Sequence, residues 1–210
     1  GRQHLARSLE IAPEHNFQEH AARAFANCAC SAMTQHRYSQ AQSFLDRGID
    51  YCVENDLATW RDYMRGVKAQ LLLRHGLWDE AAAEALDVIT NDQATALVRY
   101  PALAALARLR VRRGDPSAEP IFEEMSRFLE RGIELQRLAP YAAVMAERAW
   151  LGQIDKAQAL ALIDRAETLS PTRAVFAELA SWRQLLAPDS DPGDTDGMAA
   201  PYRMLLAGNW

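Results

Sequence analysis

The sequence is poor in cysteine, and this limits how the fold can be held together. Cys28, Cys30 and Cys52 are the only three among 210 residues, an odd and low number that excludes a disulfide framework. Cys28 and Cys30 lie two residues apart on a predicted helix and point in nearly opposite directions, so they cannot share a metal ion or a bond while the helix is intact. We interpret all three as small buried hydrophobic residues.

The sequence also lacks long apolar runs, an excess of basic over acidic residues, and strand patterns. No stretch of 18 apolar residues occurs, so no membrane-spanning helix is predicted. No secretory segment opens the chain, and we expect a cytoplasmic location. The formal net charge of −5 argues against nucleic acid as the main partner of this segment, because phosphate binding depends on an excess of Lys and Arg.

No catalytic or metal-binding pattern is present either. The histidines are scattered, and His-Glu-x-x-His, Gly-x-Ser-x-Gly and phosphate-loop patterns do not occur. Alternating aspartates in residues 187–197 raise the possibility of a calcium loop, but Ala199 stands six residues after Gly193, where such a loop requires glutamate. We therefore predict no catalytic residue, no metal ion and no cofactor, and we keep an enzyme only as a third functional alternative.

What the sequence does contain is a helical hairpin between positions 60 and 89. In its first half, apolar residues recur at steps of four, three and four, the period of a helical stripe: Trp60, Met64, Val67 and Leu71. Gly76 to Trp78 form the turn, and a second amphipathic helix follows. One such hairpin cannot bury both apolar stripes alone, so it requires similar hairpins stacked on either side.

Other segments resemble this hairpin. The turns that begin at His36, Gly76 and Gly152 are each followed five residues later by an alanine, and a shorter turn at Gly114 leads to another: Ala41, Ala81, Ala157 and Ala118. Twelve residues before the alanines of the full-length turns stand Ala29, Ala69 and the larger Met145. Small residues there allow antiparallel helices to approach closely. We predict an all-α fold: a tetratricopeptide-like right-handed superhelical solenoid of antiparallel helix pairs, with a period longer than the usual repeat of about 34 residues.

The predicted organisation has three parts. Residues 1–186 form the tetratricopeptide-like helical repeats, 187–197 an acidic flexible loop, and 198–210 the first helix of a further, truncated repeat. Within the repeats we expect helices over about 2–12, 17–35, 38–54, 57–75, 77–90, 97–113, 116–131, 138–151, 154–169 and 172–186. A solenoid unpaired at both ends is expected to be a segment of a longer protein; if it is complete, its end faces should pair with another copy as a homodimer.

The repeat geometry also predicts a binding surface. First helices of such pairs line a concave groove, and the residues predicted to face it are Arg23, Tyr63, Gln70, Arg74, Arg108, Arg112 and Trp150. Arginines beside aromatic residues suit an acidic or phosphorylated segment and resemble interface anchors. The alternative is that these arginines pair with Glu119, Glu123 or neighbouring helices, or are simply solvated.

Several segments resemble one particular class of helical repeat. They are 52–63 (CVENDLATWRDY), the turn 76–80, 106–116 (LARLRVRRGDP), 134–140 (ELQRLAP) and 201–210 (PYRMLLAGNW). They are similar to the helical-repeat region of large bacterial LuxR-type transcriptional regulators with an N-terminal ATPase module, and to repeats in ATPase-bearing adenylate or guanylate cyclases. The resemblance implies a parent protein with an ATPase before these repeats and a DNA-binding helix-turn-helix after them. Neither a phosphate loop nor a helix-turn-helix is present in this segment.

Two functions follow as the main expectations. The first is a non-catalytic scaffold and sensor segment of a larger transcriptional regulator, which binds a protein or a small inducer in its groove and relays this to attached domains of the parent chain. The second is a freestanding tetratricopeptide-like adaptor that self-associates through its open ends. In neither case do we expect this segment to bind nucleic acid directly or to enter a membrane.

Overall fold

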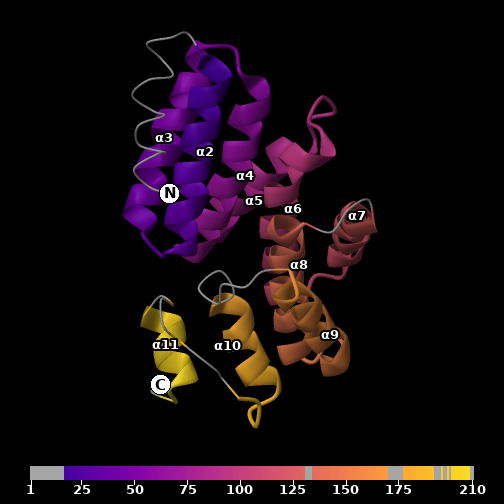
Figure 1. Cartoon of the computed structure of the whole chain (residues 1–210). Helices are drawn as coiled ribbons and strands as arrows, with labels where there is room; N and C mark the ends of the chain where they lie inside the picture. Colours follow the sequence, from indigo (N-terminus) through magenta and orange to yellow (C-terminus); the bar gives the residue numbers. More distant parts are fainter. Residues whose placement is uncertain are drawn as a thin grey trace. The chain divides into compact units, whose positions relative to one another are not determined.

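The structure, a computed structural model, describes residues 17–130, 134–169, 177–191, 195, 198 and 200–208. These residues are almost entirely helical and contain no strand (Figure 1). The helices are α2 (Gln18–Thr34), α3 (Tyr38–Glu54), α4 (Ala58–Arg74), α5 (Trp78–Ile89), α6 (Ala96–Arg113), the short 3-10 helix η1 (Pro116–Ala118), α7 (Glu119–Glu130), α8 (Leu135–Trp150), α9 (Lys156–Glu167), α10 (Ala177–Leu186) and α11 (Ala200–Leu206). The expected all-α class is confirmed for this part of the chain, whereas the superhelical solenoid stays a prediction.

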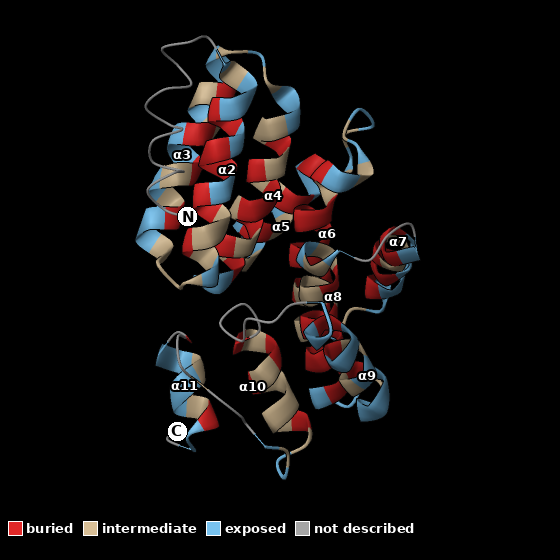
Figure 2. Ribbon diagram, viewed as in Figure 1, coloured by how far each residue is buried: buried red, intermediate tan, exposed pale blue. Residues whose placement is uncertain are grey.

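The chain divides into two compact units, unit 1 (residues 1–109) and unit 2 (residues 110–210). In unit 1, α2 packs on α3 and on α4, and α4 packs on α5 (Figure 1). The apolar residues of α2, α3 and α4 meet in one cluster of buried side chains, which includes Ala22, Phe25, Ala29, Ala41, Leu45, Cys52, Met64, Val67 and Leu71. In α3 and α5 the buried positions follow one side of the helix, as an amphipathic helix requires, whereas α4 has buried residues on two opposite sides (Figure 2).

Two glycines in unit 1 allow helices to approach closely. A Cβ atom at Gly48 on α3 would lie 2.7 Å from Met64 Sδ and 2.8 Å from Phe25 Cβ. A Cβ atom at Gly66 on α4 would lie 2.9 Å from the backbone nitrogen of Ala102 on α6. All three distances are shorter than a carbon atom tolerates, so glycine at these positions is a packing requirement.

Five of the described turns between helices share one local geometry. At Gly76, Gly114 and Gly152 the backbone φ is positive, and the following residue donates to the carbonyl five residues earlier, as in Leu77 to Leu72 at 3.0 Å. This is the Schellman arrangement that satisfies the last carbonyls of a helix. His36 and Asp56 adopt it with φ of 55° and 54° although they carry side chains. The turn at Asp56, between α3 and α4, has this geometry although the spacing of alanines in the sequence did not indicate it.

The alanine that follows each turn is buried in three of four cases. Ala41, Ala81 and Ala118 are buried, but Ala157 is exposed and Ala159 takes its place in the core. The cause is the cap of α9: the Asp155 carboxylate accepts from Ala157 N at 2.8 Å, so the helix begins two residues later than in the other full-length turns. The buried alanine of this hairpin, Ala159, therefore stands two positions later than the alanine spacing of the other full-length turns.

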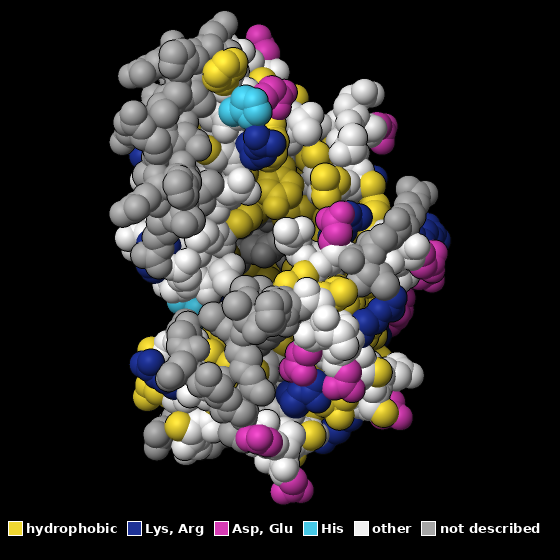
Figure 3. All heavy atoms as spheres, viewed as in Figure 1, with side chains coloured by type: hydrophobic (Ala, Val, Ile, Leu, Met, Phe, Trp, Pro, Cys, Tyr) yellow, Lys and Arg dark blue, Asp and Glu magenta, His cyan; other side chains and the backbone are white. Residues whose placement is uncertain are grey.

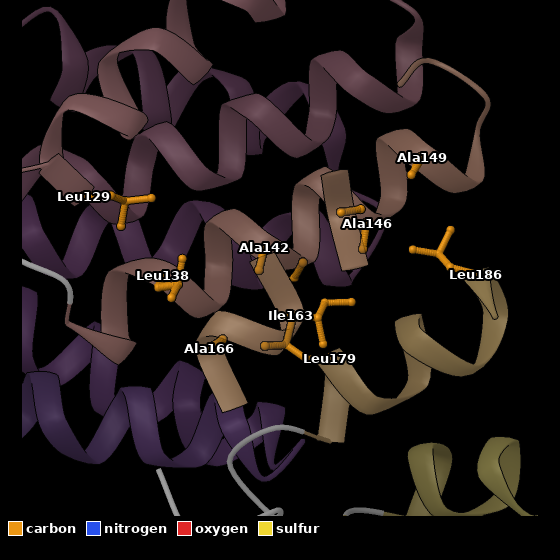
Figure 4. Close-up of a cluster of buried hydrophobic side chains, with 11 residues drawn as sticks. Leu129, Leu138, Ala142, Ala146, Ala149, Ile163, Ala166, Leu179 and Leu186 are labelled. Carbon is orange, nitrogen blue, oxygen red and sulfur yellow. The ribbon is translucent and has the colours of Figure 1, made fainter. Parts of the chain in front are cut away.

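Unit 2 has its own core, centred on α8. Eight consecutive residues of α8, Ala142 to Ala149, are buried, because other helices pack on several of its sides. Figure 4 shows side chains of α7, α8, α9 and α10 meeting there, with Ala142 and Ala146 of α8 near Ile163 of α9 and Leu179 of α10. Small side chains on α8 leave room for the larger aliphatic ones.

Some boundaries differ from those predicted. α8 begins at Leu135 and not at 138, so Pro140 lies inside the helix and not in its first turn. The predicted helix over 2–12 and the first residues of the one over 172–186 lie outside the described residues, as does much of the acidic segment 187–197. Residues 187–191 contain no helix, and α11 lies within the predicted helical segment 198–210.

Candidate binding surface

In unit 1, successive first helices of the hairpins contact each other directly. Side chains of α2 reach α4, where Trp60 Nε1 donates to the Glu19 carboxylate and Cys30 Sγ lies 3.8 Å from the Tyr63 hydroxyl. Gln70 of α4 reaches α6, where its Nε2 donates to the Pro101 carbonyl at 3.0 Å. Proline has no backbone N–H, so within a helix the carbonyl one turn before it loses its usual donor. The carbonyl of Pro101 itself has an additional donor, the side-chain amide of Gln70.

Aromatic side chains gather where α2 and α4 meet. We call this surface the α2–α4 face and define it by Phe17, Glu19, His20, Arg23, Trp60 and Tyr63. The Trp60 and Tyr63 rings pack edge to face with centroids 6.2 Å apart, and Phe17 and His20 do so at 5.8 Å. Both residues on α4 are half-buried, while Phe17 is 55% exposed. Figure 3 shows hydrophobic side chains in the upper half of the view, near a histidine and a basic side chain.

The acidic and basic side chains of the α2–α4 face belong to α2. Glu19 and Arg23 lie one helical turn apart on the side of α2 that also carries Cys30. Arg23 Nη2 donates to His20 Nδ1 at 2.7 Å, which fixes this histidine nitrogen as the acceptor because a guanidinium only donates. Both Glu19 and Arg23 are exposed, so they remain accessible to a molecule that approaches the two helices.

The Tyr63–Cys30 contact is neutral at physiological pH. Burial raises the pKa of the Tyr63 phenol, and the nearby Cys30 thiol raises it further. Burial likewise raises the pKa of Cys30. Neither group therefore ionises near pH 7, and the pair contributes packing and a weak hydrogen bond between α2 and α4, not reactivity.

The other candidates in unit 1 do not join this face through any contact described. Gln70 is half-buried and bound to α6. Arg74 is exposed at the last turn of α4, and Arg108 is half-buried on α6. Of the seven predicted residues, the structure places Arg23 and Tyr63 on the surface where α2 and α4 meet.

In unit 2, Arg112 and Trp150 have different environments. Arg112 Nε donates at 2.5 Å to Glu147, whose side chain is only 8% exposed. This is the ion pairing that was left open as the alternative, although the partner is Glu147 and not Glu119 or Glu123. Trp150 is 56% exposed, and its ring centroid lies 6.3 Å from that of Trp182 on α10.

Arg148 takes the acidic partner that had been considered for the arginines of α6. It donates to Glu119 and lies over the Phe122 ring, with the guanidinium carbon 4.4 Å from the ring centroid. Its side chain is 10% exposed. A stacked, paired arginine of this kind holds α7 against α8.

Four members of the α2–α4 face were not among the predicted site residues: Phe17, Glu19, His20 and Trp60. Trp60 was assigned to the apolar stripe of α4, and the fact that its indole N–H would need a partner was the signal for a polar neighbour. Glu19 could not be paired with it from sequence, because it lies about forty residues away and the packing of α2 on α4 brings the two together. His20 contacts Phe17 and Arg23, which are its neighbours in the sequence.

Comparisons with known protein families, with curated proteins and with solved structures gave no match. Among the described residues, no helix is both long and apolar enough to cross a bilayer, and no group of three or more His, Cys, Asp or Glu side chains is arranged to hold a metal ion.

Proposed function

We propose that this chain is a non-catalytic, cytoplasmic scaffold and sensor segment that binds a peptide segment of another protein, or of its own parent chain, on the α2–α4 face. In this proposal the helix pairs are tetratricopeptide-like repeats. The resemblance of several sequence segments to LuxR-type regulators makes a large bacterial transcriptional regulator the proposed parent. The attached ATPase and DNA-binding domains of such a parent would receive the signal.

The observation that supports this proposal best is the grouping of aromatic rings with an accessible arginine. Trp60 and Tyr63 are half-buried and pack edge to face with each other, and Arg23 lies on the adjoining helix. Aromatic and arginine side chains provide most of the binding energy in many interfaces, since they offer large contact areas with little loss of side-chain freedom. Anchors that are already ordered also lower the entropy cost of binding.

The proposal is tested by selecting peptides from a displayed random library on the purified chain. The affinity of each selected peptide is then measured by fluorescence anisotropy for the natural protein, for Trp60→Ala and for Leu86→Ala. Leu86 is 40% exposed on α5 and lies outside the α2–α4 face, so its variant is a matched control for the loss of an exposed apolar side chain. Circular dichroism checks that both variants remain helical.

We expect Trp60→Ala to weaken binding of the selected peptides by about tenfold or more. The Leu86→Ala variant should bind them with unchanged affinity. Peptides that bind Trp60→Ala as well as the natural protein, or a selection that enriches no peptide, would contradict the proposal.

A further inference from the structure

Glu19 occupies a position that a ligand could take. Its carboxylate accepts the indole N–H of Trp60 across the α2–α4 boundary, and it is exposed to solvent. An indole nitrogen is only a donor, so on this face it requires an acceptor oxygen. In the unbound chain that oxygen comes from the protein itself.

Arg23 is held by a weaker partner than a guanidinium can have. Its one described contact is to the neutral His20 Nδ1, through a single nitrogen. A guanidinium presents five N–H donors in a planar fork and pairs best with a carboxylate, which accepts two parallel hydrogen bonds. Glu19, one turn away, is bound to Trp60 and not to Arg23.

Two donors on one exposed face, the Trp60 indole and the Arg23 guanidinium, are therefore suited to carboxylate oxygens. Around them the rings of Phe17, Trp60 and Tyr63 offer apolar contact area. We infer that the α2–α4 face takes a carboxylate-bearing peptide segment with apolar residues beside its acidic ones, and that Glu19 fills the carboxylate position in the unbound chain. This inference rests on the proposed function and adds the chemical class of the ligand.

In this arrangement Glu19 competes with the ligand for the Trp60 indole N–H. A ligand carboxylate must displace Glu19 from Trp60, and the negative charge of Glu19 repels the ligand until it does. Removing Glu19 frees the indole donor and removes the repulsion, so binding of an acidic peptide should become tighter. If the Glu19–Trp60 hydrogen bond served only to hold the two helices together, the loss of Glu19 would loosen the packing of α2 on α4. It would not favour binding of one peptide charge over the other.

The experiment uses two labelled twelve-residue probe peptides that are identical in their leucine and glycine residues. One carries glutamate at its charged positions and the other carries lysine. Their affinities are measured by anisotropy for the natural chain, Glu19→Ala and Arg23→Gln. Two matched controls on α3 remove the same charges at exposed positions that are not members of the face: Glu54→Ala and Arg47→Gln.

We expect the glutamate peptide to bind about fivefold more tightly to Glu19→Ala and about tenfold more weakly to Arg23→Gln. The two α3 controls should change its affinity by less than about twofold. The lysine peptide should bind more weakly than the glutamate peptide to every variant that retains Arg23. Added salt should reduce the difference, because the contacts are exposed.

Three results would overturn the inference. They are equal affinity for the two peptides, weaker binding of the glutamate peptide to Glu19→Ala, and an equal effect of Glu54→Ala. If library-selected peptides still require Trp60 but carry no acidic residues, the proposed function stands and the carboxylate inference alone fails.

Discussion

Replacing Gly66 by alanine tests the packing of α4 on α6. The substitution has two opposing effects on the free energy of unfolding, and the size of each is known. Alanine in place of glycine inside a helix normally stabilises by about 1 kcal/mol, because glycine has more backbone freedom to lose. Here the new Cβ atom would lie 2.9 Å from the Ala102 backbone nitrogen and 3.1 Å from Pro101 Cβ. A backbone atom cannot rotate away, so α6 must shift, and overpacking of this kind costs about 1–3 kcal/mol.

Two features of the structure make the clash the larger effect. Gly66 and Ala102 are both buried, so the strain cannot be relieved into solvent. A shift of α6 would also lengthen the Gln70–Pro101 hydrogen bond, now 3.0 Å. We expect Gly66→Ala to lower the free energy of unfolding by as much as about 2 kcal/mol, the difference between the overpacking cost and the gain in helix propensity.

The assay is thermal and urea unfolding followed by circular dichroism. Ala83→Gly, at an exposed position of α5, is the matched control and should cost about 1 kcal/mol, since it measures helix propensity without packing. If Gly66→Ala is as stable as the natural chain or more stable, while Ala83→Gly loses the expected amount, the close approach of α4 and α6 is wrong.

Three further predictions concern unit 1. Asp62 is buried and accepts hydrogen bonds from Arg61 Nε at 2.9 Å and from Asn91 Nδ2 at 2.8 Å. Asp62→Ala should therefore lower the free energy of unfolding, measured in urea, by about 1–3 kcal/mol, and Asp62→Asn should lower it by less. Asp56→Gly should stabilise and Gly76→Ala destabilise by about 1 kcal/mol each, because both positions have positive φ; thermal midpoints that move the other way would contradict this. Burial raises the pKa of Cys52 from 9.0 to about 11. The folded state therefore binds the Cys52 thiol proton more tightly than the unfolded state does. The resulting stabilisation of the folded state is complete below pH 9 and is lost as the pH rises through about 11. Replacing Cys52 by alanine should flatten that part of the stability profile.

Much of the local structure could be predicted from sequence. Apolar residues at helical spacing identified α3, α4 and α5 to within one or two residues, and glycine at 76, 114 and 152 marked turns that have the same geometry. Both signals are short-range, since periodicity and positive φ depend on neighbouring residues only. The start of α8 was missed because Pro140 was interpreted as a first-turn residue, whereas the packed α8 tolerates proline at its sixth position.

The predicted groove residues differ in where the structure places them. Arg23 and Tyr63 both lie on the α2–α4 face, and a binding role for them stays a prediction. Gln70 and Arg112 have the residue types of a binding site, but in the structure they donate to Pro101 and Glu147. Which polar side chains find partners within the chain depends on distances between helices that sequence spacing does not give.

The amino-acid sequence by itself determined that this chain is helical, where most of its helices begin and end, and which side of each is apolar, because these properties arise from interactions over a few residues. Only the tertiary structure decided that Glu19 lies against Trp60, that Gly66 lies against Ala102 and that Arg112 is paired. Those contacts join residues about thirty to forty positions apart, and they exist only because the close-packed apolar stripes fix how each helix lies on the next.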